Sequence, residues 1–190
     1  MKVLLFDADG VVLKKMRYFS ERFAQEYNIP PEEIVHFFKN EFRLCQQNKA
    51  DLKEELSKYL PTWKWDKDAD DFLDYWFTSD AILDEAVLEE IKKFRSQGFT
   101  CYLATDQEKY RAHYLLERLD LKNKLDGGFF SCDLGFQKSQ PEFFEQVIEK
   151  LGVQPTDILY WDDDPQNVEV AKALGIDARL YTGIEDLGNI

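Results

Sequence analysis

Short apolar runs alternate with amphipathic segments over most of this chain. The first run, residues 3–6 (VLLF), is unbroken, too short for a helix and followed by turn-forming residues. Such a run predicts a strand that is buried on both faces, as in parallel sheets. Runs of similar character follow at residues 99–104, 128–131, 158–161 and 177–181. The alternation predicts an α/β fold, with a Rossmann-like parallel sheet wound by helices on both faces.

Helices are predicted between these strands, and three of them have recognisable starts. Asp84 stands where an N-cap side chain accepts hydrogen bonds from the first helical turn. Ser139 and Glu142 have the spacing of a capping box. Asp164 followed by Pro165 predicts the start of the last long helix, since proline suits the first helical position.

Residues 14–79 interrupt the alternation with a wholly helical pattern. Apolar side chains such as Phe19 and Phe23 recur at helical spacing. This region holds half of the chain's Phe, Trp and Tyr residues, which a small helical unit needs for its core. Stacking on a substrate stays open for one or two of them. We therefore expect two domains, a core of residues 1–13 and 80–190 and a small all-helical domain inserted after the first strand.

Composition narrows the choice of partners. The 190 residues carry a formal charge of −13, which argues against binding to nucleic acid or to an anionic membrane surface. An anionic substrate would need a metal ion or a local Lys or Arg. The three cysteines are widely spaced and resemble neither a zinc site nor a disulfide framework. With no apolar run of signal-peptide or membrane-spanning length, we expect a cytoplasmic protein.

Polar side chains follow four of the predicted strands. In strand order they are Asp7 and Asp9; Thr105 and Asp106; Lys138; and Asp162, Asp163 and Asp164. Each has an ordinary alternative, because aspartate and threonine cap helices and a single lysine is usually solvated. Parallel strands, however, bring their carboxyl ends to one edge of the sheet, where ligands bind in open α/β folds. The joint occurrence therefore favours a site.

The chemistry of these groups is complementary. Crowded carboxylates repel one another unless a cation such as Mg²⁺, which prefers oxygen ligands, lies among them. One carboxylate can attack phosphorus, and a second can protonate the leaving oxygen and then activate water. A hydroxyl and an ammonium group can bind the remaining phosphate oxygens.

Four motifs in this order resemble the haloacid dehalogenase (HAD) superfamily, in its phosphatase-like branch. Residues 7–12 (DADGVV) match the pattern D-x-D-G-x-[VT], and residues 103–105 (LAT) match an apolar strand ending in Ser or Thr. Lys138, followed by Ser139 where the family usually has proline, matches the third motif. The acidic run at residues 160–164 (YWDDD) resembles the fourth.

The resemblance implies roles for the matching residues. Asp7 is expected to be the nucleophile and Asp9 the general acid and base. The expected phosphate-binding residues are Thr105, Asp106 and Lys138. The expected ligands of a Mg²⁺ cofactor are Asp7, Asp9, Asp162 and Asp163, of which Asp163 would be the main acidic ligand from the fourth motif and Asp162 a second ligand or an outer partner. The helical domain resembles the family's cap, which closes over the site and selects the leaving group.

Substrate specificity is expected from the cap. Arg43, Asn48 and Lys49 flank a turn that faces the active site in relatives with such caps, where basic groups could meet a second anionic group of the substrate. The alternative is a solvated helix end.

The function predicted by these residues and the resemblance is Mg²⁺-dependent hydrolysis of a small phosphomonoester through an aspartyl-phosphate. Asp9 favours phosphate-ester chemistry over dehalogenation, because dehalogenases need no acid at that position. A phosphomutase of the same fold is one alternative, and a phosphoacceptor or binding relative without enzymatic activity is another. The expected partner is a small phosphorylated substrate; the sequence indicates neither which one nor the oligomeric state.

Overall fold

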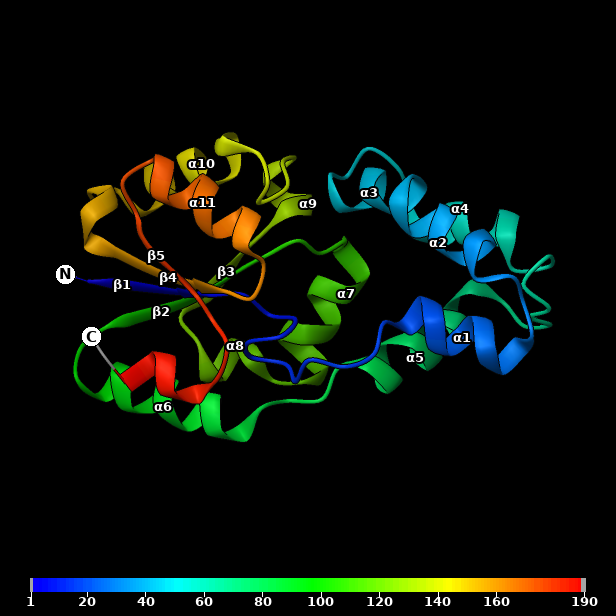
Figure 1. Cartoon of the computed structure of the whole chain (residues 1–190), viewed down its shortest axis with the longest axis horizontal. Coiled ribbons are helices and arrows are strands. Elements are labelled where there is room, and N and C mark those ends of the chain that lie inside the picture. Colours follow the sequence, from blue (N-terminus) through cyan, green and yellow to red (C-terminus); the bar gives the residue numbers. More distant parts are fainter. Residues whose placement is uncertain (1, 189–190) are drawn as a thin grey trace.

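The computed structural model describes residues 2–188, and its centre is a five-stranded parallel sheet (Figure 1). The strands are β1 (Val3–Phe6), β2 (Thr100–Thr105), β3 (Gly127–Phe130), β4 (Ile158–Asp162) and β5 (Asp177–Leu180). Their order in the sheet is β3-β2-β1-β4-β5, and every neighbouring pair is parallel. The predicted strands and the α/β fold are confirmed.

β1 occupies the centre because its side chains are apolar on both faces. Leu4 and Phe6 belong to the apolar cluster under one face, whereas Val3 and Leu5 belong to the cluster under the other. The Phe6 ring stacks on the ring of Trp161 in β4, with centroids 5.1 Å apart. A strand that is buried on both faces cannot carry charge along its length, so its first carboxylate stands at its end.

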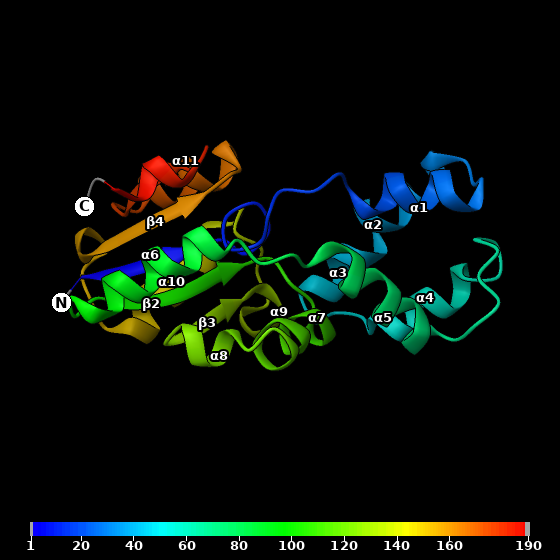
Figure 2. The same ribbon diagram turned by 90° about the horizontal axis from the view of Figure 1, so that it is seen from below.

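Helices cover both faces of the sheet, as Figures 1 and 2 show. One face carries α6 (Glu85–Ser96), α7 (Lys109–His113), a π-helical turn (Tyr114–Arg118), α8 (Leu121–Lys124) and a final 3₁₀ turn (Ile184–Gly188). The other carries α10 (Pro141–Leu151) and α11 (Pro165–Ala173). The short helix α9 (Ser131–Leu134) follows β3, and a 3₁₀ turn (Pro155–Asp157) precedes β4.

The predicted helix starts are right in two cases and wrong in one. Asp84 caps α6, where its carboxylate accepts hydrogen bonds from two backbone N–H groups, and Asp164 caps α11. The capping box of Ser139 and Glu142 is absent. Gln140 is the N-cap of α10, without a side-chain cap. Its side-chain oxygen instead accepts a hydrogen bond from the backbone N–H of Gln137, because a tight turn precedes the helix.

The region between β1 and α6 is helical and has an apolar core of its own. Its helices are α1 (Phe19–Tyr27), α2 (Pro31–Lys39), α3 (Glu41–Gln46), α4 (Leu52–Tyr59) and α5 (Ala69–Asp80). Most of the region's aromatic residues fill that core, with Phe23, Phe37, Trp63 and Phe72 fully buried, whereas Tyr18 is exposed. We call α1–α5 the helical unit. Its treatment as a separate domain of residues 14–79 stays a prediction, and Met1 and residues 189–190 lie outside the described residues.

Two neighbouring chain segments connect the helical unit to the sheet. The backbone N–H of Lys14 donates to the carbonyl of Ile82 at 2.8 Å, and the N–H of Asp84 donates to the carbonyl of Val12 at 2.9 Å. The paired connections place the helical unit beyond the carboxyl ends of the strands (Figures 1 and 2). Within residues 2–188, none of the helices has the length and apolar character needed to cross a membrane.

Candidate active site

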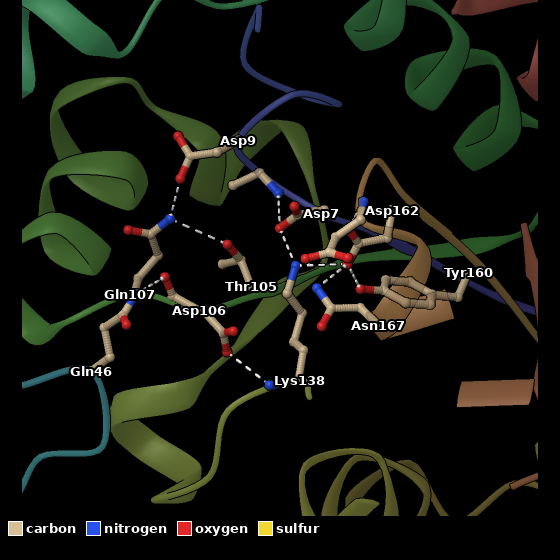
Figure 3. A network of polar contacts seen from close by, with 12 residues as sticks. Asp7, Asp9, Gln46, Thr105, Asp106, Gln107, Lys138, Tyr160, Asp162 and Asn167 are labelled. Atoms are coloured by element: carbon tan, nitrogen blue, oxygen red, sulfur yellow. Dashed lines mark hydrogen bonds and ion pairs between the residues drawn. The ribbon is translucent and has the colours of Figure 1, made fainter. Parts of the chain in front are cut away.

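The residues predicted from the strand ends meet at one edge of the sheet (Figure 3). They line a cavity of about 510 Å³ between the core and the helical unit. Its wall includes all eight strand-end residues: Asp7, Asp9, Thr105, Asp106, Lys138, Asp162, Asp163 and Asp164. The parallel topology thus gathers side chains from four strands, as the sequence pattern predicted.

Asp7 is the buried carboxylate at the end of β1. Its backbone N–H still bonds to the sheet, donating to the carbonyl of Trp161 at 2.9 Å. Its Oδ1 accepts a hydrogen bond from the backbone N–H of Ala8 at 2.7 Å and lies 2.6 Å from Nζ of Lys138. The side chain is 8% exposed, so these contacts hold it in one place at the floor of the cavity.

Lys138 joins Asp7 to Asp162, since its Nζ lies 2.8 Å from Asp162 Oδ2. The same Oδ2 accepts hydrogen bonds from Asn167 Nδ2 at 3.0 Å and from the hydroxyl of Tyr160. Asp162 Oδ1 accepts from the backbone N–H of Asp164 at 2.8 Å. Four donors therefore surround this carboxylate, which is well satisfied for a fully buried group (Figure 3).

Asp163 completes a group of three acidic residues. One oxygen from each of Asp7, Asp162 and Asp163 lies within 4.8 Å of the others, which is close enough for a shared cation. Lys15, an exposed lysine, pairs with Asp163 Oδ2 at 2.8 Å. Gly10 permits this arrangement because a Cβ there would lie 2.5 Å from the Asp163 carboxylate.

The electrostatics of the buried centre favour added positive charge. Burial, and then the charge of Asp162, raises the pKa of Asp7 well above its usual range, although Lys138 acts in the opposite direction. Burial lowers the pKa of Lys138, but Asp7, Asp162 and Asp106 outweigh it, so Lys138 stays protonated. Carboxylates outnumber cations here, and a divalent ion would balance them.

Asp9 lies apart from that acidic group. Its side chain is about half exposed, at 52%, and accepts hydrogen bonds from Arg111 Nη2 at 2.8 Å and Gln107 Nε2 at 2.6 Å. Burial acts to raise the pKa of Asp9, but the Arg111 guanidinium and the Gln107 amide outweigh this effect. The net result is a lowered pKa. The predicted ligand Asp9 thus directs its side chain away from the other three carboxylates and toward α7.

Sequence reasoning missed Arg111 and Gln107, both of which are buried. Gln107 Nε2 also donates to the hydroxyl of Thr105 at 3.2 Å, so one amide orients two predicted site residues. Two sequence signals were available: both residues follow Thr105 within six positions, and a helix start after a strand end faces the site. Neither signal says which face of the helix is turned inward.

Asp106 acts on the position of Lys138 in this structure. Its Oδ1 accepts a hydrogen bond from the backbone N–H of Lys138 at 2.9 Å, and this contact fixes the loop that carries the ammonium group. Burial raises the pKa of Asp106. Its backbone carbonyl accepts from Gln46 Nε2 of α3 at 2.9 Å, which links the loop to the helical unit.

The three predicted specificity residues do not share one location. Arg43 lines the cavity, whereas Asn48 and Lys49 are not part of its wall. Lys49 is exposed and its Nζ donates to Gln47 Oε1 at 2.6 Å, within its own turn. The helical unit instead contributes Gln46, which the sequence reading passed over, together with several aromatic rings.

A buried carboxylate beside a lysine, with further carboxylates grouped at the ends of parallel strands, is the arrangement that the resemblance to HAD hydrolases predicts. The family model for haloacid dehalogenase-like hydrolases matches residues 1–175, and the chain belongs to this family. The predicted family and enzyme class are confirmed.

Particular relatives refine this picture. Over an alignment of 197 positions, the chain is 25% identical to a phosphorylated carbohydrates phosphatase of Thermotoga maritima. The alignment covers 100% of this chain and 88% of that protein. A HAD family enzyme from Bacteroides thetaiotaomicron, in a magnesium complex, has the same fold, with a TM-score of 0.80, 19% identity and coverage of 95% and 93%. A putative β-phosphoglucomutase of Thermotoga maritima matches with a TM-score of 0.63, 24% identity and coverage of 100% and 93%.

Proposed function

We propose that the protein is a Mg²⁺-dependent hydrolase of a small phosphomonoester and that the reaction passes through an aspartyl-phosphate on Asp7. One observation carries this proposal. A buried carboxylate, an ammonium group 2.6 Å from it and two further carboxylates converge at the floor of a cavity large enough for a small molecule. Their charges and geometry suit the transfer of a phosphoryl group.

The three grouped carboxylates fit a hard divalent cation. Mg²⁺ takes oxygen ligands and retains water, so three protein oxygens within 4.8 Å of one another are sufficient. Four donors already engage Asp162, so we assign Asp163, directly after β4, as the main acidic ligand from this strand end and Asp162 as a second or outer partner. Asp9 would contribute through its backbone carbonyl. When bound, Mg²⁺ would hold a phosphate oxygen and reduce the repulsion between that oxygen and Asp7.

In the first step, an oxygen of Asp7 forms a bond to phosphorus while the bond between phosphorus and the leaving oxygen breaks. Lys138 and the hydroxyl of Thr105 bind the phosphoryl oxygens as their charge increases. Asp9 donates a proton to the leaving oxygen, so the alcohol departs neutral. This step transfers the phosphoryl group to the protein and leaves Asp9 ionised.

In the second step, water attacks the same phosphorus atom. Asp9 accepts a proton from the water, the bond to Asp7 breaks, and inorganic phosphate leaves. The lowered pKa of Asp9 keeps it ionised, as a proton acceptor must be, although it also makes the carboxylate a weaker base. Before the acid step, Asp9 must take up a proton, which weakens its ion pair with Arg111.

We assign the helical unit the role of a cap. It closes the side of the cavity opposite the strand ends and limits the leaving group to a small molecule. The phosphatase name of the Thermotoga maritima relative supports a phosphorylated substrate. The fold shared with a putative β-phosphoglucomutase makes a phosphomutase the second candidate.

The test is phosphate release from a panel of phosphorylated metabolites, measured with Mg²⁺ and with a chelator. We expect release by the wild type only with Mg²⁺. Asp7→Asn should lose at least about a thousandfold in kcat, and Asp9→Asn about a hundredfold or more, because they lose nucleophilic and acid–base catalysis. Asp133→Asn, which changes an exposed aspartate outside the cavity wall, is the matched control.

Three outcomes would contradict the proposal. Full activity of Asp7→Asn would exclude Asp7 as the nucleophile. Interconversion of isomeric phosphates with little free phosphate would identify a phosphomutase. Stable phosphorylation by small phosphodonors without turnover would identify a phosphoacceptor protein.

A further inference from the structure

One side chain of the helical unit contacts both chain segments that carry the expected phosphate-binding groups. Gln46, the last residue of α3, donates from Nε2 to the backbone carbonyl of Asp106 at 2.9 Å (Figure 3). Its Oε1 accepts a hydrogen bond from Gln137 Nε2 at 2.8 Å. Asp106 directly follows Thr105, and Gln137 directly precedes Lys138. We call residues 105–106 and 137–138 the phosphate-binding segments, and the amide of Gln46 joins them.

The position of the Lys138 ammonium group depends on how these segments lie. The backbone N–H of Lys138 donates to Asp106 Oδ1 at 2.9 Å, so the two segments also meet directly. Lys138 belongs to a tight turn, in which the backbone N–H of Gln140 donates to the carbonyl of Gln137 at 2.8 Å. Its Nζ lies 2.6 Å from Asp7 Oδ1. A shift of this turn would move the ammonium group away from the nucleophile, and small misplacements of this kind are costly in catalysis.

The contact between Gln46 and Gln137 acts on the protein rather than on a substrate. Gln46 lines the cavity, but both polar atoms of its side chain already have protein partners. Gln137 is not part of the cavity wall. A change at Gln137 therefore reaches the site through the phosphate-binding segments and through Gln46, without removing a direct contact with the ligand.

We propose that Gln46 is a positioning residue through which the helical unit, docked on the core, holds the phosphate-binding segments in place for the phosphoryl group. The inference rests on the proposed function and concerns the control of that same site. Movement of the helical unit away from the core breaks both hydrogen bonds of Gln46, so phosphate is held less tightly at the stage when it must leave. Conversely, bound phosphate favours the docked position of the unit.

A second hydrogen bond between the core and the helical unit separates positioning from docking alone. The hydroxyl of Tyr110 donates to Asp51 Oδ2 at 2.8 Å. Neither residue lies in a phosphate-binding segment, and neither is part of the cavity wall. If docking alone mattered, the loss of either contact between the core and the unit would affect the site equally. The proposal instead predicts an effect that is specific to Gln46 and its partner Gln137.

The experiment measures the binding of inorganic phosphate by titration calorimetry, with Mg²⁺ present, to the wild type, Gln46→Ala and Gln137→Ala. Phosphate has no leaving group, so it reports on the phosphate-binding segments and not on contacts between a leaving group and the helical unit. Each variant should raise the Kd for phosphate about fivefold, which corresponds to about one hydrogen bond. The double variant should lose no more than Gln46→Ala alone, because Gln137 acts through Gln46.

Tyr110→Phe is the matched control. It removes the hydrogen bond to Asp51, keeps the ring and leaves both hydrogen bonds of Gln46 in place. The Kd for phosphate should stay at the wild-type value in this variant. Gln137→Ala changes a residue of the core and leaves the helical unit intact, so it still tests the proposal if Gln46→Ala folds poorly.

The outcomes separate the two proposals. Unchanged phosphate binding in either Gln46→Ala or Gln137→Ala, or an equal loss in Tyr110→Phe, would overturn the positioning role, while the phosphatase proposal would stand. Losses that multiply in the double variant would overturn it as well, since Gln137 would then act independently of Gln46. If the wild type neither bound phosphate nor hydrolysed any phosphomonoester, the proposed function would fail first, and the positioning role with it.

Discussion

Gly10 illustrates how one residue is fixed by the site around it. Its φ of +90° lies in the left-handed region that favours glycine, and a Cβ would lie 2.5 Å from Asp163. Gly98 has nearly the same backbone, with φ +91°, but open space where its Cβ would be. The two glycines therefore separate backbone strain from crowding of the acidic group.

We predict that Gly10→Ala and Gly98→Ala each lower the free energy of unfolding by about 1 kcal/mol, because both force alanine into a strained conformation. Only Gly10→Ala should also displace Asp163 and raise the Mg²⁺ concentration for half-maximal phosphatase activity, by about tenfold. Urea unfolding and Mg²⁺ titrations of activity measure the two effects. An equal Mg²⁺ requirement in both variants would show that Asp163 does not depend on Gly10.

At the residue scale, the sequence predicted groups that the topology brings together but not those that orient them. The buried contacts among Asp7, Lys138 and Asp162 follow from the strand ends of a parallel sheet. The partners of Asp9 do not, since Arg111 and Gln107 reach it through the path of the chain after β2 and the rotation of α7. The hydrophobic periodicity of the sequence predicts neither this path of the chain nor this rotation of the helix.

At the scale of elements, helix N-caps formed by an Asp side chain could be predicted from the sequence. A helix start that depends on the preceding turn could not. Asp84 and Asp164 accept hydrogen bonds from the first turns of their helices, as expected. The predicted cap at Ser139 is wrong because the turn after Lys138 moves the start of α10 to Pro141. Glu108, which the sequence analysis did not single out, caps α7 by accepting from the backbone N–H groups of Tyr110 and Arg111.

Glu108 gives a stability prediction for that helix. Burial raises its pKa to about 7 from a usual value of 4.5. A carboxyl group with a raised pKa in the folded state stabilises the fold at low pH and loses that contribution as pH rises through its folded pKa. The free energy of unfolding should therefore contain a component that falls by about 3 kcal/mol between about pH 4.5 and pH 7.5.

Glu108→Gln should remove that component while keeping an oxygen for the cap. Urea unfolding at several pH values measures it as the difference between wild type and variant. Glu145→Gln, which changes an exposed glutamate of α10, controls for general charge effects. A wild-type pH dependence that Glu108→Gln leaves unaltered would contradict the assignment.

At the scale of the whole molecule, a strongly acidic protein gathers cations around one cavity. The formal charge is −13, yet the cavity wall includes Lys14, Lys15, Arg43, Arg111 and Lys138. These residues come from both the core and the helical unit. Seven aspartates line the same wall, so these lysines and arginines offset only part of its negative charge, and an anionic substrate would still need a divalent cation there.

Side-chain contacts hold the helical unit against the core. Gln46 donates to the Asp106 carbonyl and accepts from Gln137 Nε2 at 2.8 Å, and the Tyr110 hydroxyl donates to Asp51 Oδ2 at 2.8 Å. We predict that the double variant Gln46→Ala, Tyr110→Phe shifts the protein toward an open form. Losing these hydrogen bonds should lower kcat/KM about tenfold and enlarge the radius of gyration in solution scattering.

Gln47→Ala is the control for this pair, because Gln47 bonds within its own turn to Lys49. It should match the wild type in both measurements. A double variant with unchanged scattering and unchanged kcat/KM would show that these hydrogen bonds are not needed to hold the helical unit in place.

The most direct test of the whole account is to look for the phosphoryl group on Asp7. The protein is mixed with a hydrolysed phosphomonoester and Mg²⁺, quenched in acid during turnover, digested and analysed by mass spectrometry. The account predicts a phosphorylated peptide modified at Asp7 and none in Asp7→Asn. With p-nitrophenyl phosphate, whose leaving group needs no proton, more of this peptide should accumulate in Asp9→Asn, because water is activated more slowly. Phosphate release by the wild type and Asp9→Asn with no phosphorylated peptide, or with the group on another residue, would contradict it.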